Sequence, residues 1–161
     1  FIRTAKEYGR PMRVLEAVEA VNEAQKEVLF EKFVRYYHGD VAGRQVTVWG
    51  LAFKPETDDM RQAPSLVLID ALLKAGCQVS VYDPMTEATR HLGDRVHYAL
   101  DIYDSVLDAD AIFHVTEWKA FRMPAWEVIR RSVRTPLLID GRNVFDTAPV
   151  EAGFTLLQIG Q

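Results

Sequence analysis

Residues 1–40 carry apolar positions at helical spacing. When the residues from Pro11 to His38 are placed about 100° apart, the apolar side chains fall within a sector about 140° wide. They are Val14, Leu15, Val18, Val21, Val28, Leu29, Phe33 and Tyr36. Pro11 suits a first helical turn, and Gly39 is a typical helix end. The pattern predicts one helix from Pro11 to His38, about 40 Å long, which exceeds the needs of one small domain. We expect it to bridge domains or subunits; the alternative is that it lies wholly on its own domain's sheet.

After Gly39 the pattern changes to short apolar runs that alternate with amphipathic stretches. The runs predict strands at 45–50, 78–82, 96–98, 111–115, 136–140 and 154–158, and the stretches predict helices at 65–75, 86–92, 102–107 and 125–131. Such alternation favours right-handed crossovers and a parallel sheet covered on both faces. We therefore predict an α/β protein with a Rossmann-like open, mainly parallel sheet, preceded by a long helix. Residues 1–40 form the helical region, and residues 41–161 form the α/β domain.

Composition narrows the range of partners and compartments. With 19 Lys and Arg against 23 Asp and Glu, the net charge is −4, which excludes a basic nucleic-acid-binding module. The longest apolar stretch, Leu66 to Leu73, is too short to cross a bilayer, so we expect no membrane partner. Cys77 is the only cysteine, which excludes an intramolecular disulfide framework and favours the reducing cytoplasm. Phe1 to Arg13 lack a signal-peptide core and begin without methionine, as if cut from a longer chain.

Three cations follow predicted strands, where ligands of open parallel sheets bind. Lys54 and Arg61 follow the first strand, and Arg142 follows the fifth. Three cations at one sheet edge suit phosphate groups, because Arg offers planar bidentate contacts and Lys a compact charge. The alternative is that Lys54 and Arg61 only pair with acidic neighbours on a solvated loop, namely Glu56, Asp58 and Asp59. Phe53 is either an aromatic ledge for a base or a buried anchor.

A dinucleotide site after the first strand is disfavoured. Gly50 ends that strand, but position 52 is Ala and position 55 is Pro, so the G-x-G-x-x-G turn that admits a pyrophosphate is missing. In a dinucleotide site a helix begins directly after this glycine turn, whereas here the next predicted helix begins only at about Pro64. Asp83 follows the second strand, and we interpret it as a turn residue rather than as a ribose contact.

No catalytic residue and no metal site is predicted. Cys77 directly precedes the second strand, at the end opposite the expected ligand edge, so we interpret it as structural. The histidines show no metal-ligand spacing. His114 lies in an apolar strand and is interpreted as a satisfied core residue.

Four ordered motifs carry a family resemblance over essentially the whole chain. VTVWGLAFKPETDDMRQAPSLVLIDALLKAG, VYDP, VTEWKAF and IDGRNVFD resemble the carboxyl-terminal domain of the UDP-glucose/GDP-mannose dehydrogenase family. The opening TAKEYGRPMRVLEAVEAVNEAQK is similar to its central helix. The resemblance implies two NAD-dependent oxidations that turn UDP-glucose into UDP-glucuronate, with NAD bound mainly by a preceding Rossmann domain. It also implies that the helix from Pro11 to His38 forms a homodimer.

The resemblance also implies roles for single residues. Three positions match family residues that contact the UDP-sugar, namely Lys54, the neighbouring Phe53, and Arg142. Arg61 matches an arginine of the family that contacts NAD. The family's catalytic cysteine lies in a loop that should precede Phe1, and Cys77 does not match it. Covalent catalysis needs that thiolate, so we expect this chain alone to be inactive. Two alternatives stay open: a dehydrogenase of the same family that acts on GDP-mannose or a UDP-N-acetyl-hexosamine, and a purely structural dimerisation module.

Overall fold

The computed structural model describes residues 13–57, 59–61, 63–85 and 92–160, and these contain a six-stranded sheet. The strands are β1 Gln45–Trp49, β2 Gln78–Tyr82, β3 His97–Tyr98, β4 Ala111–His114, β5 Leu137–Asp140 and β6 Thr155–Gln158. Their order is β3-β2-β1-β4-β5-β6, and every paired neighbour is parallel. The strand order therefore reverses between β1 and β4, and all carboxyl ends meet at one edge. This confirms the predicted Rossmann-like fold.

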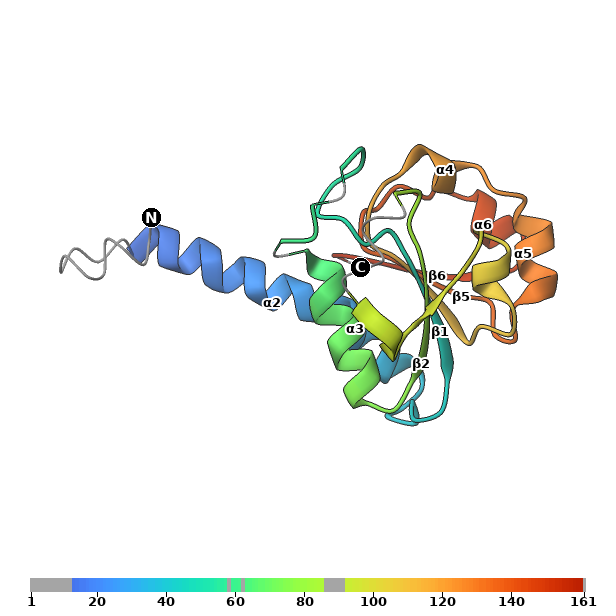
Figure 1. Ribbon diagram of the computed structural model, residues 1–161, viewed down its shortest axis with the longest axis horizontal. Helices are drawn as coiled ribbons and strands as arrows, with labels where there is room; N and C mark the ends of the chain where they lie inside the picture. The colour runs from blue at the N-terminus through green and yellow to red at the C-terminus, as the bar shows by residue number, and fades with distance from the viewer. Residues whose placement is uncertain (1–12, 58, 62, 86–91, 161) are drawn as a thin grey trace.

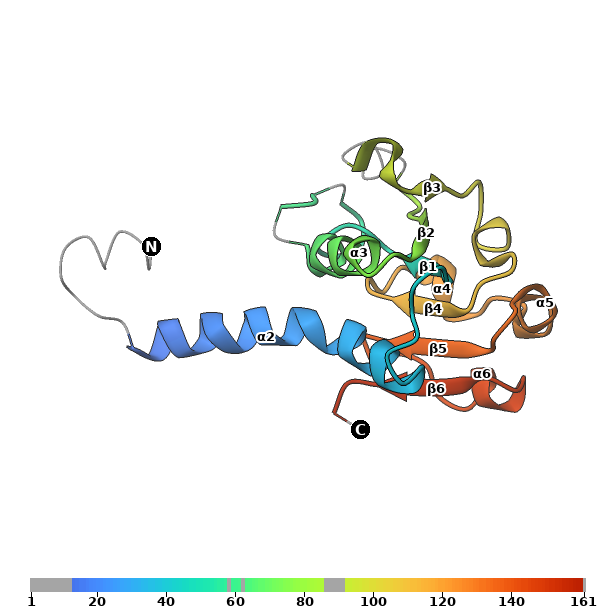
Figure 2. The ribbon, with the colours of Figure 1, turned by 90° about the horizontal axis from the view of Figure 1, so that it is seen from below.

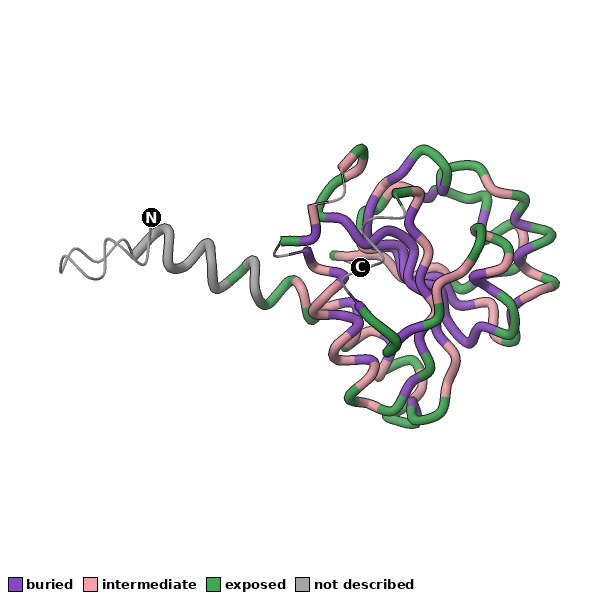
Figure 3. Tube along the Cα trace, viewed as in Figure 1, coloured by how far each residue is buried: buried purple, intermediate pink, exposed green. Residues whose placement is uncertain are grey.

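Helices cover both faces of the sheet (Figures 1 and 2). One face carries α2 (Arg13–Tyr36) and α3 (Pro64–Lys74). The other carries the 3-10 helix η2 (Asp104–Val106), α4 (Lys119–Arg122), α5 (Trp126–Ser132) and α6 (Ala148–Glu151). Because side chains alternate along a strand, Val46 and Val48 join the core under α2 and α3, whereas Trp49 joins the second core. The strands are accordingly buried at the centre of the molecule (Figure 3).

Among the α2 side chains that the structure describes, those in the last turns of the helix belong to this core. Leu29 and Phe33 are buried, whereas Val21 is 58% exposed, and the helix projects away from the sheet (Figure 1). The alternative that the helix lies wholly on its own sheet is therefore wrong. The helix ends at Tyr36 rather than His38, and Gly39 follows with a φ of 87°. The predicted start, residues 11 and 12, lies outside the described residues.

Several short elements differ from the sequence prediction. The sequence predicts a helix over residues 102–107, but only a single 3-10 turn forms there. Asp101 caps its start by accepting the amides of Tyr103 and Asp104, and the chain leaves the helical conformation at Leu107, with a ψ of 123°, and at Asp108, with a φ of 56°. The predicted helix at 86–92 falls almost entirely outside the described residues. Helices α4 and α6 were not predicted, because four residues are too few to show a helical period.

Candidate functional site

The loop after β1 begins with a glycine that no other residue can replace without strain. Gly50 has a φ of 85°, and a Cβ placed there would lie 2.5 Å from Cβ of Thr116, which follows β4. The Gly50 amide donates to the carbonyl of Tyr82, at the end of β2. The chain therefore leaves β1 pressed between the ends of its two neighbouring strands, β2 and β4.

A single buried carboxylate holds this loop. Asp83 accepts the amides of Leu51 at 2.6 Å and Ala52 at 3.3 Å, together with the amide of Met85 at 2.8 Å and the indole N–H of Trp118 at 3.3 Å. Asp83 is only 2% exposed, and both of its oxygens are engaged. The interpretation as a turn residue is confirmed. With this carboxylate turned inward and Ala52 and Pro55 in place of glycines, the residues present do not fit a dinucleotide pyrophosphate and ribose at this strand.

Beyond Ala52 the loop turns outward to solvent. The amide of Phe53 donates to the carbonyl of Asp59 at 2.9 Å, which closes the loop, and Glu56 lies at its tip with a φ of 62°. Phe53 is 51% exposed, so it is an accessible aromatic surface and not a buried anchor. Lys54 is also exposed and forms no ion pair within the described part of the chain.

Arg61 forms an ion pair with Asp59 of its own loop, which is the alternative that the sequence left open for this cation. Its Nε and Nη2 donate to the two carboxylate oxygens of Asp59 at 2.9 and 2.8 Å. These bonds lower the pKa of Asp59 to about 2, and the charge of nearby Lys54 acts in the same direction. Lys54 and Arg61 thus lie around one carboxylate. Of the other two acidic neighbours, Glu56 has its Oε1 atom 4.0 Å from Nζ of Lys119, and Asp58 lies outside the described residues.

The loop after β5 is held by a second buried carboxylate. Oδ1 of Asp140 accepts the Arg142 amide at 3.0 Å, and Oδ2 accepts the amides of Val144 at 2.8 Å and Phe145 at 3.1 Å. Gln158 Nε2 adds a further bond at 3.2 Å. The Arg142 side chain is exposed and forms no ion pair among the residues that the structure describes.

His114 completes this second cluster from the end of β4. Its Nδ1 lies 2.9 Å from Oδ1 of Asp140, and both side chains are fully buried. Its Nε2, however, has no hydrogen-bond partner among the described residues. The prediction that His114 is a core residue with all its hydrogen bonds made therefore holds for Nδ1 and not for Nε2. Burial raises the pKa of Asp140, but the bonds from His114, the loop amides and Gln158 outweigh it and hold the pKa at about 2. Sequence reasoning missed Asp140; the one available signal was an acidic residue directly at a strand end.

These loops leave the same edge of the sheet, on either side of β4. Lys54 follows β1 and Arg142 follows β5, and β4 separates these two strands. The hydroxyl of Thr116, just after β4, donates to the carbonyl of Ala52 at 2.6 Å and ties the first loop to the central strand. The three cations thus follow strands that end at the same edge of the sheet, and Arg61 is engaged with Asp59.

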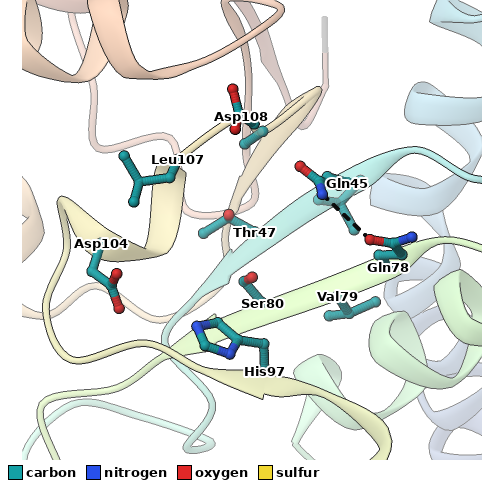
Figure 4. A pocket seen from close by; sticks show the side chains of 11 residues that line it. Gln45, Thr47, Gln78, Val79, Ser80, His97, Asp104, Leu107 and Asp108 are labelled. Atoms are coloured by element: carbon teal, nitrogen blue, oxygen red, sulfur yellow. Dashed lines mark hydrogen bonds between the residues drawn. The ribbon is translucent and has the colours of Figure 1, made fainter.

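A pocket of about 300 Å³ lies elsewhere (Figure 4). Its floor comes from Gln45 and Gln78, the first residues of β1 and β2, and from Thr47 and Ser80 two positions further along. Asp104 and Asp108 contribute carboxylates to its wall, and none of the predicted site residues lines it. Two carboxylates and no Lys or Arg make this pocket unsuitable for phosphate groups.

Cys77 is structural. It is 6% exposed, its thiol donates to the carbonyl of Val41 at 3.3 Å, and burial raises its pKa to about 11. A thiol with such a pKa carries almost no thiolate at neutral pH. Within the described ranges, no helix is both long and apolar enough to span a membrane, and no cluster of three or more His, Cys, Asp or Glu residues could hold a metal ion.

Comparisons with known proteins agree on one family. The model described as "UDP-glucose/GDP-mannose dehydrogenase family, UDP binding domain" matches residues 47–147. The chain is 47% identical to a UDP-glucose 6-dehydrogenase of Pseudomonas aeruginosa and 36% identical to one of Rhizobium meliloti, each match covering 99% of this chain and 37% of the relative. The chain thus spans a little over a third of the length of these relatives.

Solved structures of similar proteins support the same fold. A UDP-glucose dehydrogenase from Pyrobaculum islandicum has a TM-score of 0.79 at 29% identity, covering 99% of this chain and 34% of that one. An NDP-N-acetyl-D-galactosaminuronic acid dehydrogenase from Methanosarcina mazei has a TM-score of 0.68 at 26% identity, covering 86% of this chain and 29% of that one.

Proposed function

The chain belongs to the UDP-glucose/GDP-mannose dehydrogenase family, as its UDP-binding domain, and from this premise we propose that its carboxyl edge binds the UDP portion of a sugar nucleotide. The observation that carries the proposal is the pair of exposed cations, Lys54 and Arg142, on loops that leave β1 and β5 on either side of β4. Neither cation forms an ion pair within the described residues, so both can bind an external anion.

Each residue has a distinct part in this binding. Arg142 presents a planar guanidinium that can hold a phosphate through two parallel hydrogen bonds, and Lys54 adds a compact positive charge. Phe53, half exposed beside Lys54, offers a ring on which the uracil base can stack. The nearby carboxylates of Asp83 and Asp140 do not compete for these cations, because buried amides and side-chain donors already occupy their oxygens.

We propose UDP-glucose as the substrate and UDP-glucuronate as the product of the full-length protein. The relatives named UDP-glucose 6-dehydrogenase are 47% and 36% identical to this chain, whereas the N-acetyl-hexosaminuronate enzyme is 26% identical. NAD, when bound to a preceding domain, would accept the hydride from the sugar's C6 carbon. No described residue of this chain is proposed to be catalytic. Arg61, which is 89% exposed, is proposed to reach that NAD across the domain boundary.

We further propose that residues 1–40 form a linking and dimerising region, that residues 41–161 form the UDP-sugar-binding domain, and that the protein works in the cytoplasm. The exposed part of α2, which projects from the sheet, supports a homodimer through the helix from Pro11 to His38 (Figure 2). The single buried thiol of Cys77 suits a reducing compartment.

Titration of the ¹⁵N-labelled chain with UDP, followed by NMR, tests the site. We expect chemical-shift changes concentrated in residues 50–57 and 140–145, with GDP giving weaker binding. Lys54→Ala and Arg142→Ala should each weaken UDP binding by roughly tenfold, because each removes a charge-assisted contact. Lys74→Ala is the matched control: Lys74 is an exposed cation at the end of α3, paired with Asp70, and its loss should leave UDP binding unchanged.

Three outcomes would contradict the proposal. Absence of shifts at about 10 mM UDP would remove the site, since even weak binding (Kd near 1 mM) would then be nearly saturated. Shifts confined to the pocket beside Gln45 and Gln78 would place binding at the wrong end of the strands. Equal losses in the Lys74 variant would show only a general effect of charge.

A further inference from the structure

The backbone on both sides of Arg142 is fixed by side chains. On one side, the Arg142 amide donates to Oδ1 of Asp140. On the other, Asn143 adopts a φ of 53° and its side chain forms two bonds with the backbone of Ile159, both at 3.1 Å. Arg142 therefore stands at the apex of a turn whose two ends are anchored, while its own side chain stays exposed.

The Asp140 carboxylate takes the place that a bound anion would occupy in this turn. The amides of Arg142, Val144 and Phe145 all point to it. Successive amides that converge in this way form a concave anion site. Because a carboxylate of the chain itself fills that site, the turn is already ordered without ligand, and the arginine side chain is left as the group that meets a phosphate. Pre-ordering of this kind lowers the cost of binding.

His114 is retained in this cluster although it leaves a buried nitrogen unpaired. Its Nδ1 bonds to Oδ1, the same oxygen that accepts the Arg142 amide, while Nε2 has no hydrogen-bond partner among the residues that the structure describes. The ring packs against those of Phe121 and Phe145. An unpaired buried polar atom is destabilising, and an apolar ring of similar size would avoid it. The feature that His114 adds in return is a donor that fixes Oδ1 in place.

We propose that Asp140 is a positioning residue that sets Arg142 for the phosphates of the ligand, and that the Nδ1 proton of His114 holds Asp140 in that orientation. The inference rests on the proposed UDP site and goes beyond it, because neither residue touches the ligand: both are fully buried, and both oxygens of Asp140 are occupied. The contrasting view is that the two residues only stabilise the fold.

A double-mutant cycle on UDP binding separates these views, with Asp140→Asn, Arg142→Ala and the double variant. If Asp140 acts through Arg142, Arg142→Ala weakens binding roughly tenfold, Asp140→Asn weakens it by a similar factor, and the double variant binds within about twofold of Arg142→Ala alone. Multiplied effects, or an Asp140→Asn variant that folds and binds as the wild type does, would overturn the inference. If Arg142→Ala itself changes nothing, the proposed UDP contact of Arg142 fails and the inference fails with it. These results are therefore distinguishable.

Two variants of His114 keep the test valid if Asp140→Asn does not fold. His114→Phe keeps a ring between Phe121 and Phe145 but removes the donor, whereas His114→Asn keeps a donor near the Nδ1 position but loses the ring. We expect the Phe variant to bind UDP several-fold more weakly while losing less thermal stability than the Asn variant, because it keeps the ring and also removes Nε2. The Asn variant should melt at a lower temperature yet bind UDP as the wild type does. If UDP affinity instead follows melting temperature across the pair, the role of His114 is structural only.

Discussion

Buried carboxylates at strand ends organise both loops that carry the candidate cations. Asp83 ends the strand beside β1 and collects the amides of Leu51 and Ala52, and Asp140 ends β5 and collects the amides of its own loop. In each case a charge that would be costly alone is compensated by several donors. An aspartate directly after or at the end of a strand can suggest a ligand contact in a sequence, but Asp83 and Asp140 bind backbone amides of the chain itself.

The pH dependence of stability is a direct test of this compensation at Asp140. Its pKa is lowered from 3.8 to about 2 in the folded protein, below the value of about 3.9 expected when unfolded. The ionised form is favoured by folding, so its contribution is complete above about pH 4 and is lost as pH falls through 2. That contribution is on the order of 2 kcal/mol.

Urea unfolding of the wild type and Asp140→Asn between pH 2 and 5 measures this contribution. The difference in unfolding free energy between the two proteins should shrink by on the order of 2 kcal/mol as pH falls across the window. Asp146→Asn, at an exposed position close by in the sequence, is the control for the loss of one carboxylate. A constant difference for Asp140→Asn across the window would mean that its hydrogen bonds do not outweigh burial.

The sequence identifies some site residues better than others for a physical reason. The positions of Lys54 and Arg142 at the carboxyl edge could be predicted, because the strands that precede them are local properties of the chain. The role of Asp83 could be predicted only in part, since its donor Trp118 lies 35 residues away. The orphaned Nε2 of His114 could not be predicted at all, because it depends on how Phe121 and Phe145 pack around one ring.

At the scale of elements, the alternation of strands and helices was enough to predict the parallel sheet, but not its short pieces. Strands β1, β2, β4 and β5 lie within one residue of their predicted bounds. Strands β1, β4 and β5 are almost continuously buried runs, and β2 alternates between buried and more exposed positions. The stretch at 102–107 also has apolar residues at helical spacing, yet the chain leaves the helical conformation after one turn, at Leu107 and Asp108. The Asp108 amide donates to the carbonyl of Ser132 at 2.8 Å, and long-range contacts of this kind override a periodic pattern.

The turn from β1 into its loop gives a prediction at this scale. Gly50→Ala combines a left-handed backbone with a Cβ 2.5 Å from Cβ of Thr116 and 2.7 Å from its backbone nitrogen. We expect a loss of about 3 kcal/mol in unfolding free energy, from backbone strain and overpacking together.

Gly43→Ala is the matched control, because its φ is 78° but nothing lies within 4 Å of the new Cβ. It should lose only about 1 kcal/mol. Equal losses in urea unfolding would show that backbone strain alone decides both, and that Thr116 does not press on this turn.

The whole molecule has an uneven distribution of burial that bears on its assembly. The α/β body encloses two continuous cores, whereas α2 contributes Leu29 and Phe33 to one of them and then extends away with Val21 exposed (Figure 3). The projecting part of α2, which carries the exposed Val21, is the segment that we assign to the proposed dimer interface. In a two-fold dimer, one such residue would occur twice in the interface.

A charge at Val21 should therefore break the proposed dimer. Val21→Glu places a carboxylate in the interface twice, so we expect the dimer dissociation constant to rise by a factor on the order of a hundred or more. Multi-angle light scattering on the wild type at increasing concentration should show a dimer, and the variant a monomer. Glu27→Lys, a charge change at an exposed position on another side of the same helix, should leave the dimer intact. We expect both variants to retain UDP binding, since neither Val21 nor Glu27 is a proposed UDP contact. A wild type that stays monomeric at high concentration would refute the dimer while leaving the UDP site untouched.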